Sequence, residues 1–172
     1  MPDLLSLEVG FLSRVSPATQ KKLIDNSQLF RFSKGDVIFH EGNPSMYLYL
    51  LASGRVALDF GLRGGSLVAF TTVDAGEVFS WSALSDSRVE TATARALTEV
   101  EAYGIKGGVL DDLCLEDPKI GLELYRALCE VVSSRLTATR SHLLDIFGSP
   151  KFEPAFSGKS RSGGRIGEWR PI

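Results

Sequence analysis

Between residues 28 and 105, glycines and polar turns divide the chain into short apolar segments. Short strands separated by turns at regular intervals are typical of an all-β barrel or jelly roll. The turns fall at Gly35 and at residues 42–44, 53–54, 61–65 and 75–76. The strands that this pattern predicts cover residues 29–32, 36–39, 47–51, 55–60, 67–70 and 100–105.

Helical patterns flank the predicted barrel on both sides. Residues 7–26 read as N-terminal helices, with a fresh start where the cap residue Ser16 precedes Pro17. Residues 106–147 read as C-terminal helices, and Asp117 with Pro118 predicts the start of a long one. The fold class is therefore mainly β with flanking helices: an antiparallel β-roll, N-terminal helices and a long C-terminal helix.

The long helix has two apolar stripes, and each stripe needs a partner. The first stripe (Ile120, Leu124, Leu128 and Val131) is expected to pack on the barrel of its own chain. The second recurs at spacings of 3, 4, 3, 4 and 3, which are the a and d positions of a coiled-coil seam. We therefore expect a homodimer through this helix. The predicted interface residues are Cys129, Val132, Leu136, Thr139, Leu143 and Ile146.

Composition and the chain ends exclude several classes of protein. The 172 residues are 44% hydrophobic and 23% charged, with a net charge of −2, which gives no overall attraction to nucleic acid or anionic lipid. Cys114 and Cys129 are expected as buried free thiols in a reducing cytoplasm. No signal peptide or membrane span is indicated. Residues 1–148 read as one domain and residues 149–172 as a flexible, mildly basic tail.

Two stretches resemble the cyclic nucleotide-binding domain of Crp/Fnr-type bacterial regulators. The first is Phe32-x-x-Gly35-Asp36-x-Ile38-Phe39-x-Glu41-Gly42 with Tyr47-Leu48-Tyr49-Leu50-Leu51-x-Ser53-Gly54, in which the glycines suit tight corners with positive φ. The second, residues 76–84 followed by 89–96, resembles the family's phosphate-binding cassette. The resemblance covers residues 8–147 and implies a regulatory, non-catalytic sensory domain. The family's DNA-binding helix-turn-helix has no room after the long helix, so DNA binding is not expected.

The cassette keeps the family frame but changes its chemistry. In the family, loop N–H groups and an Arg hold a cyclic phosphate, and a Glu holds the ribose hydroxyl. The position of the family Glu falls on Trp81, and that of the Arg falls on Glu90. At about 4 Å and an effective dielectric constant of about 20, two like charges repel by about 4 kcal/mol. We therefore expect that cyclic AMP is not bound in the usual way.

The residues of the cassette leave several alternatives open. Arg88, two residues before Glu90, could face the same way on a strand and reach an anion, or it could pair with Glu90 or Asp86. Trp81 could stack on a ligand ring or fill the nucleotide's space as a plug. Arg95 matches a family position of structural character. The candidate ligand-binding residues are Gly76, Ser80, Trp81, Ser82, Ala83, Leu84, Arg88, Glu90, Thr91, Ala92 and Thr139.

No catalytic or metal site is expected. Cupins share this barrel architecture, but their metal needs several histidines, and the chain has only His40 and His142, on distant segments. No cofactor is certain; a cyclic nucleotide or another small anionic ligand is the candidate. The alternative functions are a plugged β-roll that binds a protein partner, and a transcription-related regulator without its own helix-turn-helix.

Overall fold

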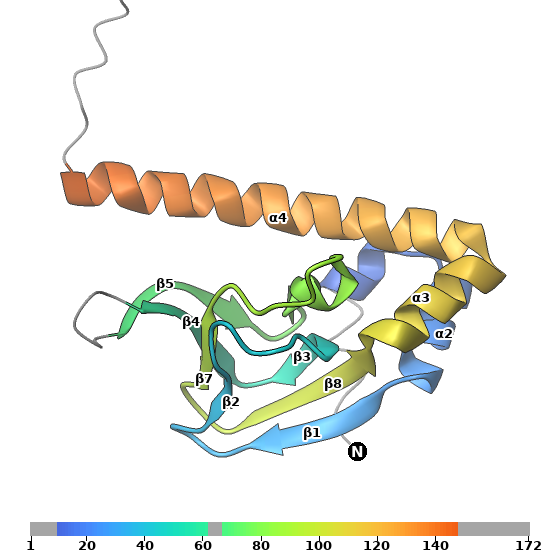
Figure 1. Cartoon of the computed structure of the whole chain (residues 1–172), viewed down its shortest axis with the longest axis horizontal. Helices are drawn as coiled ribbons and strands as arrows, with labels where there is room; N and C mark the ends of the chain where they lie inside the picture. Colours follow the sequence, from blue (N-terminus) through green and yellow to red (C-terminus); the bar gives the residue numbers. More distant parts are fainter. Residues whose placement is uncertain (1–9, 62–66, 148–172) are drawn as a thin grey trace, which may run out of the picture.

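Two antiparallel sheets form the β-roll of this protein (Figure 1). The computed structural model describes residues 10–61 and 67–147, and eight strands lie within these ranges. The sheet orders are β1-β8-β3-β6 and β2-β7-β4-β5. The strands are β1 (Gln28–Phe32), β2 (Val37–Phe39), β3 (Tyr47–Ser53), β4 (Arg55–Gly61), β5 (Leu67–Asp74), β6 (Val78–Phe79), β7 (Thr93–Ala96) and β8 (Val100–Lys106).

Two helices, α2 and α4, begin at the prolines where the sequence predicts a start. They are η1 (Phe11–Arg14), α2 (Pro17–Asp25), η2 (Trp81–Leu84), α3 (Gly107–Glu116) and α4 (Pro118–Phe147). Ser16 caps α2, with its hydroxyl accepting from the Thr19 amide at 3.4 Å. At the start of α4, the Asp117 carboxylate accepts from the Lys119 amide at 3.0 Å. Residues 7–9 of the predicted N-terminal helices and the predicted tail, 149–172, lie outside the described residues.

β3 contributes side chains to two hydrophobic cores, one under the helices and one between the two sheets. Its run from Leu48 to Ala52 is buried without interruption, as expected for a strand covered on both faces. Leu48 and Leu50 pack with the helices, while Tyr49 and Leu51 face the interior between the two sheets. The alternation of side chains along one strand thus joins the helical layer to the β-roll.

The glycine corners take the predicted backbone conformation. Gly35, Gly42 and Gly54 have φ values of 96°, 84° and 88°. At Gly54 a side chain would also collide with the backbone, because a Cβ there would lie 2.1 Å from the carbonyl oxygen of Glu99. The β3–β4 hairpin therefore depends on this glycine.

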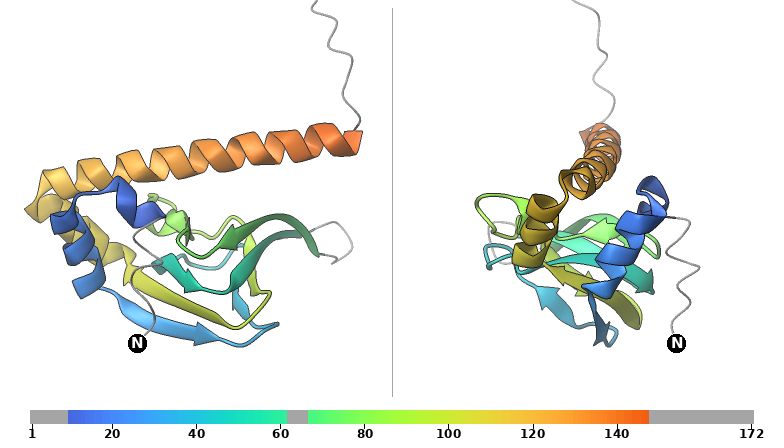
Figure 2. Two further views of the ribbon diagram at one scale, coloured as in Figure 1. Left: turned by 180° about the vertical axis from the view of Figure 1, so that it is seen from behind. Right: turned by 90° about the vertical axis from the view of Figure 1, so that its right-hand side faces the viewer.

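α4 extends across the molecule beside β5 (Figures 1 and 2). Its first half packs on the helical core through the predicted stripe: Ile120, Leu124 and Leu128 are buried, and Val131 is half-buried. Its second half runs along the roll at the side where the cassette lies. Within the described part of the chain, no helix combines the length and apolarity needed to cross a membrane.

Candidate functional site

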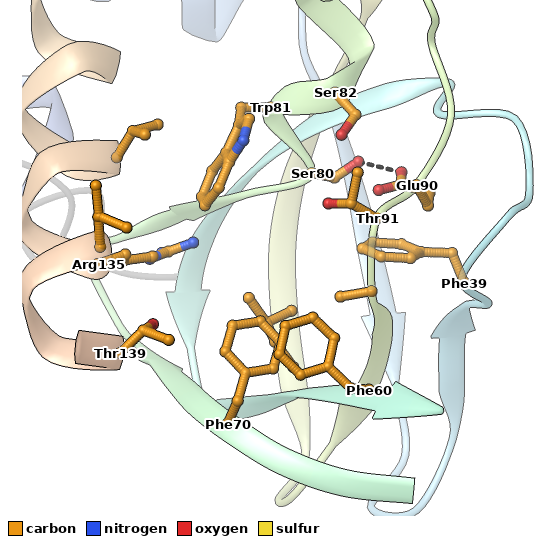
Figure 3. Close-up of a pocket in the computed structure, with 14 residues that line it drawn as sticks. Phe39, Phe60, Phe70, Ser80, Trp81, Ser82, Glu90, Thr91, Arg135 and Thr139 are labelled. Atoms are coloured by element: carbon orange, nitrogen blue, oxygen red, sulfur yellow. Dashed lines mark hydrogen bonds between the residues drawn. The ribbon is translucent and has the colours of Figure 1, made fainter. Parts of the chain in front are cut away.

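A cavity of about 270 Å³ lies between the cassette, the inner face of the β-roll and α4 (Figure 3). Its size is near the lower end for small-molecule sites. Three groups of residues line it: aromatic and aliphatic side chains of the strands, the cassette, and one face of α4. They are Phe39, Leu58, Phe60 and Phe70; Ser80, Trp81, Ser82, Glu90, Thr91 and Ala92; and Val132, Arg135, Leu136 and Thr139.

The strands supply an aromatic wall. The rings of Phe60 and Phe70 stack at 3.9 Å between centroids with an interplanar angle of 13°. Phe39 stands beside Glu90 and Thr91, across the cavity from Arg135 (Figure 3). A flat apolar group can pack on these rings, because offset aromatic contacts are favourable in such a site.

Glu90 is buried at the cassette end, with 5% of its surface exposed. Its carboxylate accepts a hydrogen bond from the hydroxyl of Ser80, which lies 3.0 Å from that of Ser45. Burial raises the pKa of the Glu90 carboxyl, and the serine hydrogen bonds offset part of that rise. The position where the family places a cation therefore holds a buried acid.

Ser80 is fixed in an unusual backbone conformation. Its φ of 61° lies in the left-handed region, which non-glycine residues seldom adopt. It precedes η2, the short helical turn predicted at Ser82 to Leu84. The hydrogen bond to Glu90 thus ties the start of η2 to the segment that leads into β7.

Arg135 is the cation of this cavity, and the sequence analysis missed it. Its Nη2 donates to the Val78 carbonyl, and its guanidinium carbon lies 4.8 Å from the centroid of the Trp81 ring. Nη1 is buried and has no hydrogen-bond partner. Burial lowers the pKa of the guanidinium, although Glu77 opposes this shift. One signal was available: Arg135 precedes Thr139 by four residues, so both lie on one face of the helix.

Trp81 forms a wall of the cavity and leaves it open. The indole stands beside Arg135 at the α4 side (Figure 3). It also borders a second hollow with Leu84 and Tyr125. Both alternatives for Trp81, stacking on a ligand ring and filling the nucleotide's space, stay predictions.

The prediction that Arg88 pairs with Glu90 or Asp86 was wrong, and the alternative that it reaches an anion stays a prediction. With a φ of 44° it lies in a turn, so it does not share a strand face with Glu90. It pairs with Asp111 on α3, away from the cavity, and with neither Glu90 nor Asp86. The ion pair with Asp111 therefore directs this side chain toward α3.

Three other cassette candidates also lie off the cavity wall. The carbonyl of Gly76 accepts from the Phe11 amide at 2.7 Å, and its amide donates to Leu51, so it forms a corner of the fold. Ala83 is buried in the helical layer, and Leu84 faces the second hollow. Arg95 pairs at 3.1 Å with Asp59, a fully buried carboxylate, which agrees with a structural character.

The predicted dimer stripe is partly described. Cys129, Val132 and Leu136 are exposed on this single chain, and Thr139 is half-buried. The side chains of Leu143 and Ile146 lie outside the described residues. The expectation of two buried thiols was wrong for the single chain, because Cys114 is half-buried and Cys129 exposed. Cys114 lies on α3, which packs on α4, whereas Cys129 lies on the exposed stripe of α4.

The described residues contain no group of three His, Cys, Asp or Glu side chains that could hold a metal ion. His40 is exposed after β2. The side chain of His142 lies outside the described residues. The polar groups of the cavity thus suit binding through hydrogen bonds and charge.

Several relatives are similar to this chain. It is 26% identical over 144 residues to a CRP-like cAMP-activated global transcriptional regulator of Mycobacterium tuberculosis, covering 84% of this chain and 62% of the relative. It is 33% identical over 94 residues to a cAMP-dependent protein kinase regulatory subunit of Hypocrea atroviridis, covering 55% of this chain and 19% of the relative. The chain thus spans less than two thirds of either curated relative.

A solved structure agrees with the observed fold. The N-terminal domain of a transcriptional regulator from Streptomyces coelicolor A3(2) matches with a TM-score of 0.64 and 26% identity, over 75% of this chain and 93% of that one. The family model of the cyclic nucleotide-binding domain matches residues 29–117, more than half of the sequence. With its two-sheet roll, its cassette and its long helix, the chain belongs to the cyclic nucleotide-binding domain family.

Proposed function

We propose that this chain is a non-catalytic sensory domain that binds a small ligand other than cyclic AMP and transmits its presence through α4. One observation carries the proposal: the cavity is lined by cassette residues on one side and by α4 residues on the other. A ligand there contacts both elements at once. It shifts the position of α4 if its affinity differs between two arrangements of that helix.

The chemistry of the cassette argues against the usual nucleotide clamp. A phosphodiester near Glu90 would meet a carboxylate in place of the family's guanidinium, and burial strengthens that repulsion. Trp81 cannot accept a hydrogen bond from a ribose hydroxyl. The mycobacterial relative is named as cAMP-activated, and these two substitutions support a different ligand here.

The open cavity supports a ligand over the alternative of a plugged scaffold. Trp81 stacks on Arg135 at the wall, and about 270 Å³ of space remains beside it. The aromatic wall and the few polar groups follow the usual composition of ligand sites.

The exposed apolar side chains of α4 support the proposed homodimer. Among the described residues of α4, the exposed large hydrophobic side chains are Leu122, Tyr125, Val132 and Leu136. With Cys129 they recur at spacings of 3, 4, 3 and 4, so they extend the predicted stripe toward the start of the helix. A second copy of the helix would cover them. DNA binding through this chain is not proposed, and a protein partner beyond the second copy remains open to test.

The experiment is thermal unfolding with and without cyclic AMP and cyclic GMP. A ligand at about 100 times its Kd stabilises by about 2.7 kcal/mol, which raises the Tm of a domain of this size by about 5 to 10 °C. We expect no such shift for the native chain. A double variant, Trp81→Glu with Glu90→Arg, restores the family residues and is the matched control that should gain a shift. If micromolar cyclic AMP or cyclic GMP raised the Tm of the native chain by this full amount, the proposal that the changed cassette does not bind these nucleotides would be refuted.

A further inference from the structure

One charged side chain of the cavity, Arg135, lacks part of its hydrogen-bond partners among the described residues. Arg14, Arg31, Arg55, Arg88 and Arg95 each pair with a carboxylate. Arg135 is half-buried and has no ion pair among the described residues. Its Nη1 is fully covered by protein atoms and has no acceptor. An unsatisfied buried donor is unfavourable, and more so when it belongs to a charged group. An acceptor removes this cost when it reaches Nη1, which requires a small shift of the side chains that cover this atom.

The free edge of the guanidinium defines the shape of that acceptor. Nη2 uses one hydrogen on the Val78 carbonyl, which leaves one on Nη2 and both on Nη1. Stacking on Trp81 holds the guanidinium plane in place. One edge with parallel N–H groups matches the two oxygens of a carboxylate. A phosphate has further oxygens, and the buried carboxylate of Glu90 is a poor neighbour for them.

The rest of the cavity defines the body of the ligand. Arg135 and Glu90 lie at opposite sides, and the rings of Phe60 and Phe70 lie between them toward the floor (Figure 3). A flat apolar body therefore suits the space between the two charged residues. At the far end, Glu90 is an acceptor near the hydroxyls of Ser82 and Thr91, so a ligand donor is favoured there.

We propose that the cavity binds a small aromatic carboxylate. Its carboxylate accepts from Nη2 of Arg135 and, once the side chains over Nη1 shift, from Nη1 as well, and its far end donates a hydrogen bond at Glu90. This inference rests on the proposed function and names the class of its ligand. Because Arg135 belongs to α4, the ligand's charge contacts the transmitting helix directly, whereas the family's cassette Arg does not lie on that helix.

The test is calorimetric titration of the full chain with 4-hydroxyphenylacetate and with its neutral counterpart, 2-(4-hydroxyphenyl)ethanol. The carboxylate should bind at least about tenfold more tightly than the alcohol, since a hydrogen bond to a charged group is stronger than one to a neutral group. Arg135→Gln should remove this preference. Arg126→Gln, at an exposed position of the same helix, is the matched control and should keep it.

Arg135→Lys keeps a charge without the planar edge and should give an intermediate preference. Circular dichroism of each variant checks that the fold is kept. A second readout is quenching of Trp81 fluorescence in a Trp169→Phe background. Equal binding of acid and alcohol, no binding of either at millimolar concentration, or a preference that survives Arg135→Gln would each overturn the carboxylate assignment. Tight cyclic AMP binding by the native chain would instead overturn the proposed function itself.

Discussion

Arg135 on α4 lies against the face of Trp81 in the cassette, with 4.8 Å between the guanidinium carbon and the ring centroid. This contact joins the cassette, in which Trp81 and Glu90 replace the family residues, to α4, which has the exposed apolar stripe. A half-buried guanidinium over an indole contributes about 0.5–2 kcal/mol. The contact therefore holds the second half of α4 near the β-roll.

A double-mutant cycle measures this contact. We expect Trp81→Ala and Arg135→Ala each to lower the free energy of unfolding, with a coupling energy of about 0.5–2 kcal/mol because each change removes the same interaction. Urea unfolding of the four proteins supplies the values. A coupling energy near zero would mean that Trp81 and Arg135 act independently. Lys119→Ala with Trp81→Ala is the control cycle, since Lys119 lies at the other end of the helix.

The exposed stripe of α4 predicts a change of assembly. Leu136, which is 69% exposed on the single chain, would lie in the proposed seam, so Leu136→Glu should place charges within it and give monomers. Light scattering measures the mass. Leu115→Glu is the control, because Leu115 is 81% exposed but lies on α3, outside the stripe. Monomers of the native chain, or dimers of Leu136→Glu, would contradict the predicted interface.

Because Glu90 is buried, we expect its contribution to the free energy of unfolding to fall as the pH rises. Its pKa in the folded protein lies above the ordinary value of 4.5, because burial disfavours the charged form. The folded state therefore binds more protons than the unfolded state between these two values. The contribution of Glu90 is full below pH 4.5 and is lost as the pH rises through the raised pKa.

Glu90→Gln should flatten this loss, since glutamine keeps an acceptor for Ser80 and has no charge to bury. Urea unfolding of both proteins across this pH range supplies the comparison. Glu116→Gln, at an exposed position on α3, is the control and should follow the native profile. Identical profiles for the native chain and Glu90→Gln would show that Glu90 does not titrate as its burial requires.

For Glu123 we expect the opposite dependence, with a contribution to the free energy of unfolding that is lost as the pH falls. Hydrogen bonds from the Thr19 side chain and then from the amide and hydroxyl of Ser16, the latter at 2.9 and 2.8 Å, lower its pKa to about 2. Its contribution is present above the ordinary value of 4.5 and is lost as the pH falls toward 2. Glu123→Gln should lower stability at neutral pH and weaken the acid loss, as measured by urea unfolding at each pH. A native-like acid profile in that variant would contradict this link between α2 and α4.

The predicted elements depend on local patterns and agree with the structure where they are described. The turn glycines, the cap at Ser16 and the stripe that contains Leu124 are each properties of a few neighbouring residues. The short strands β6 and β7 escaped the pattern, because two and four residues are too few to show a clear alternation.

Sequence motifs identify the family, the β-roll and the two changed residues of the cassette, Trp81 and Glu90. The positions of the charged side chains depend on contacts between distant elements. Arg88 turns to Asp111 because α3 returns to the cassette loop, and Arg135 enters the cavity because α4 crosses the roll at that height. The partners in each of these contacts are far apart in the sequence, so no local sequence pattern predicts that they lie close together. The fold brings them together, so the chemistry of the site follows from packing.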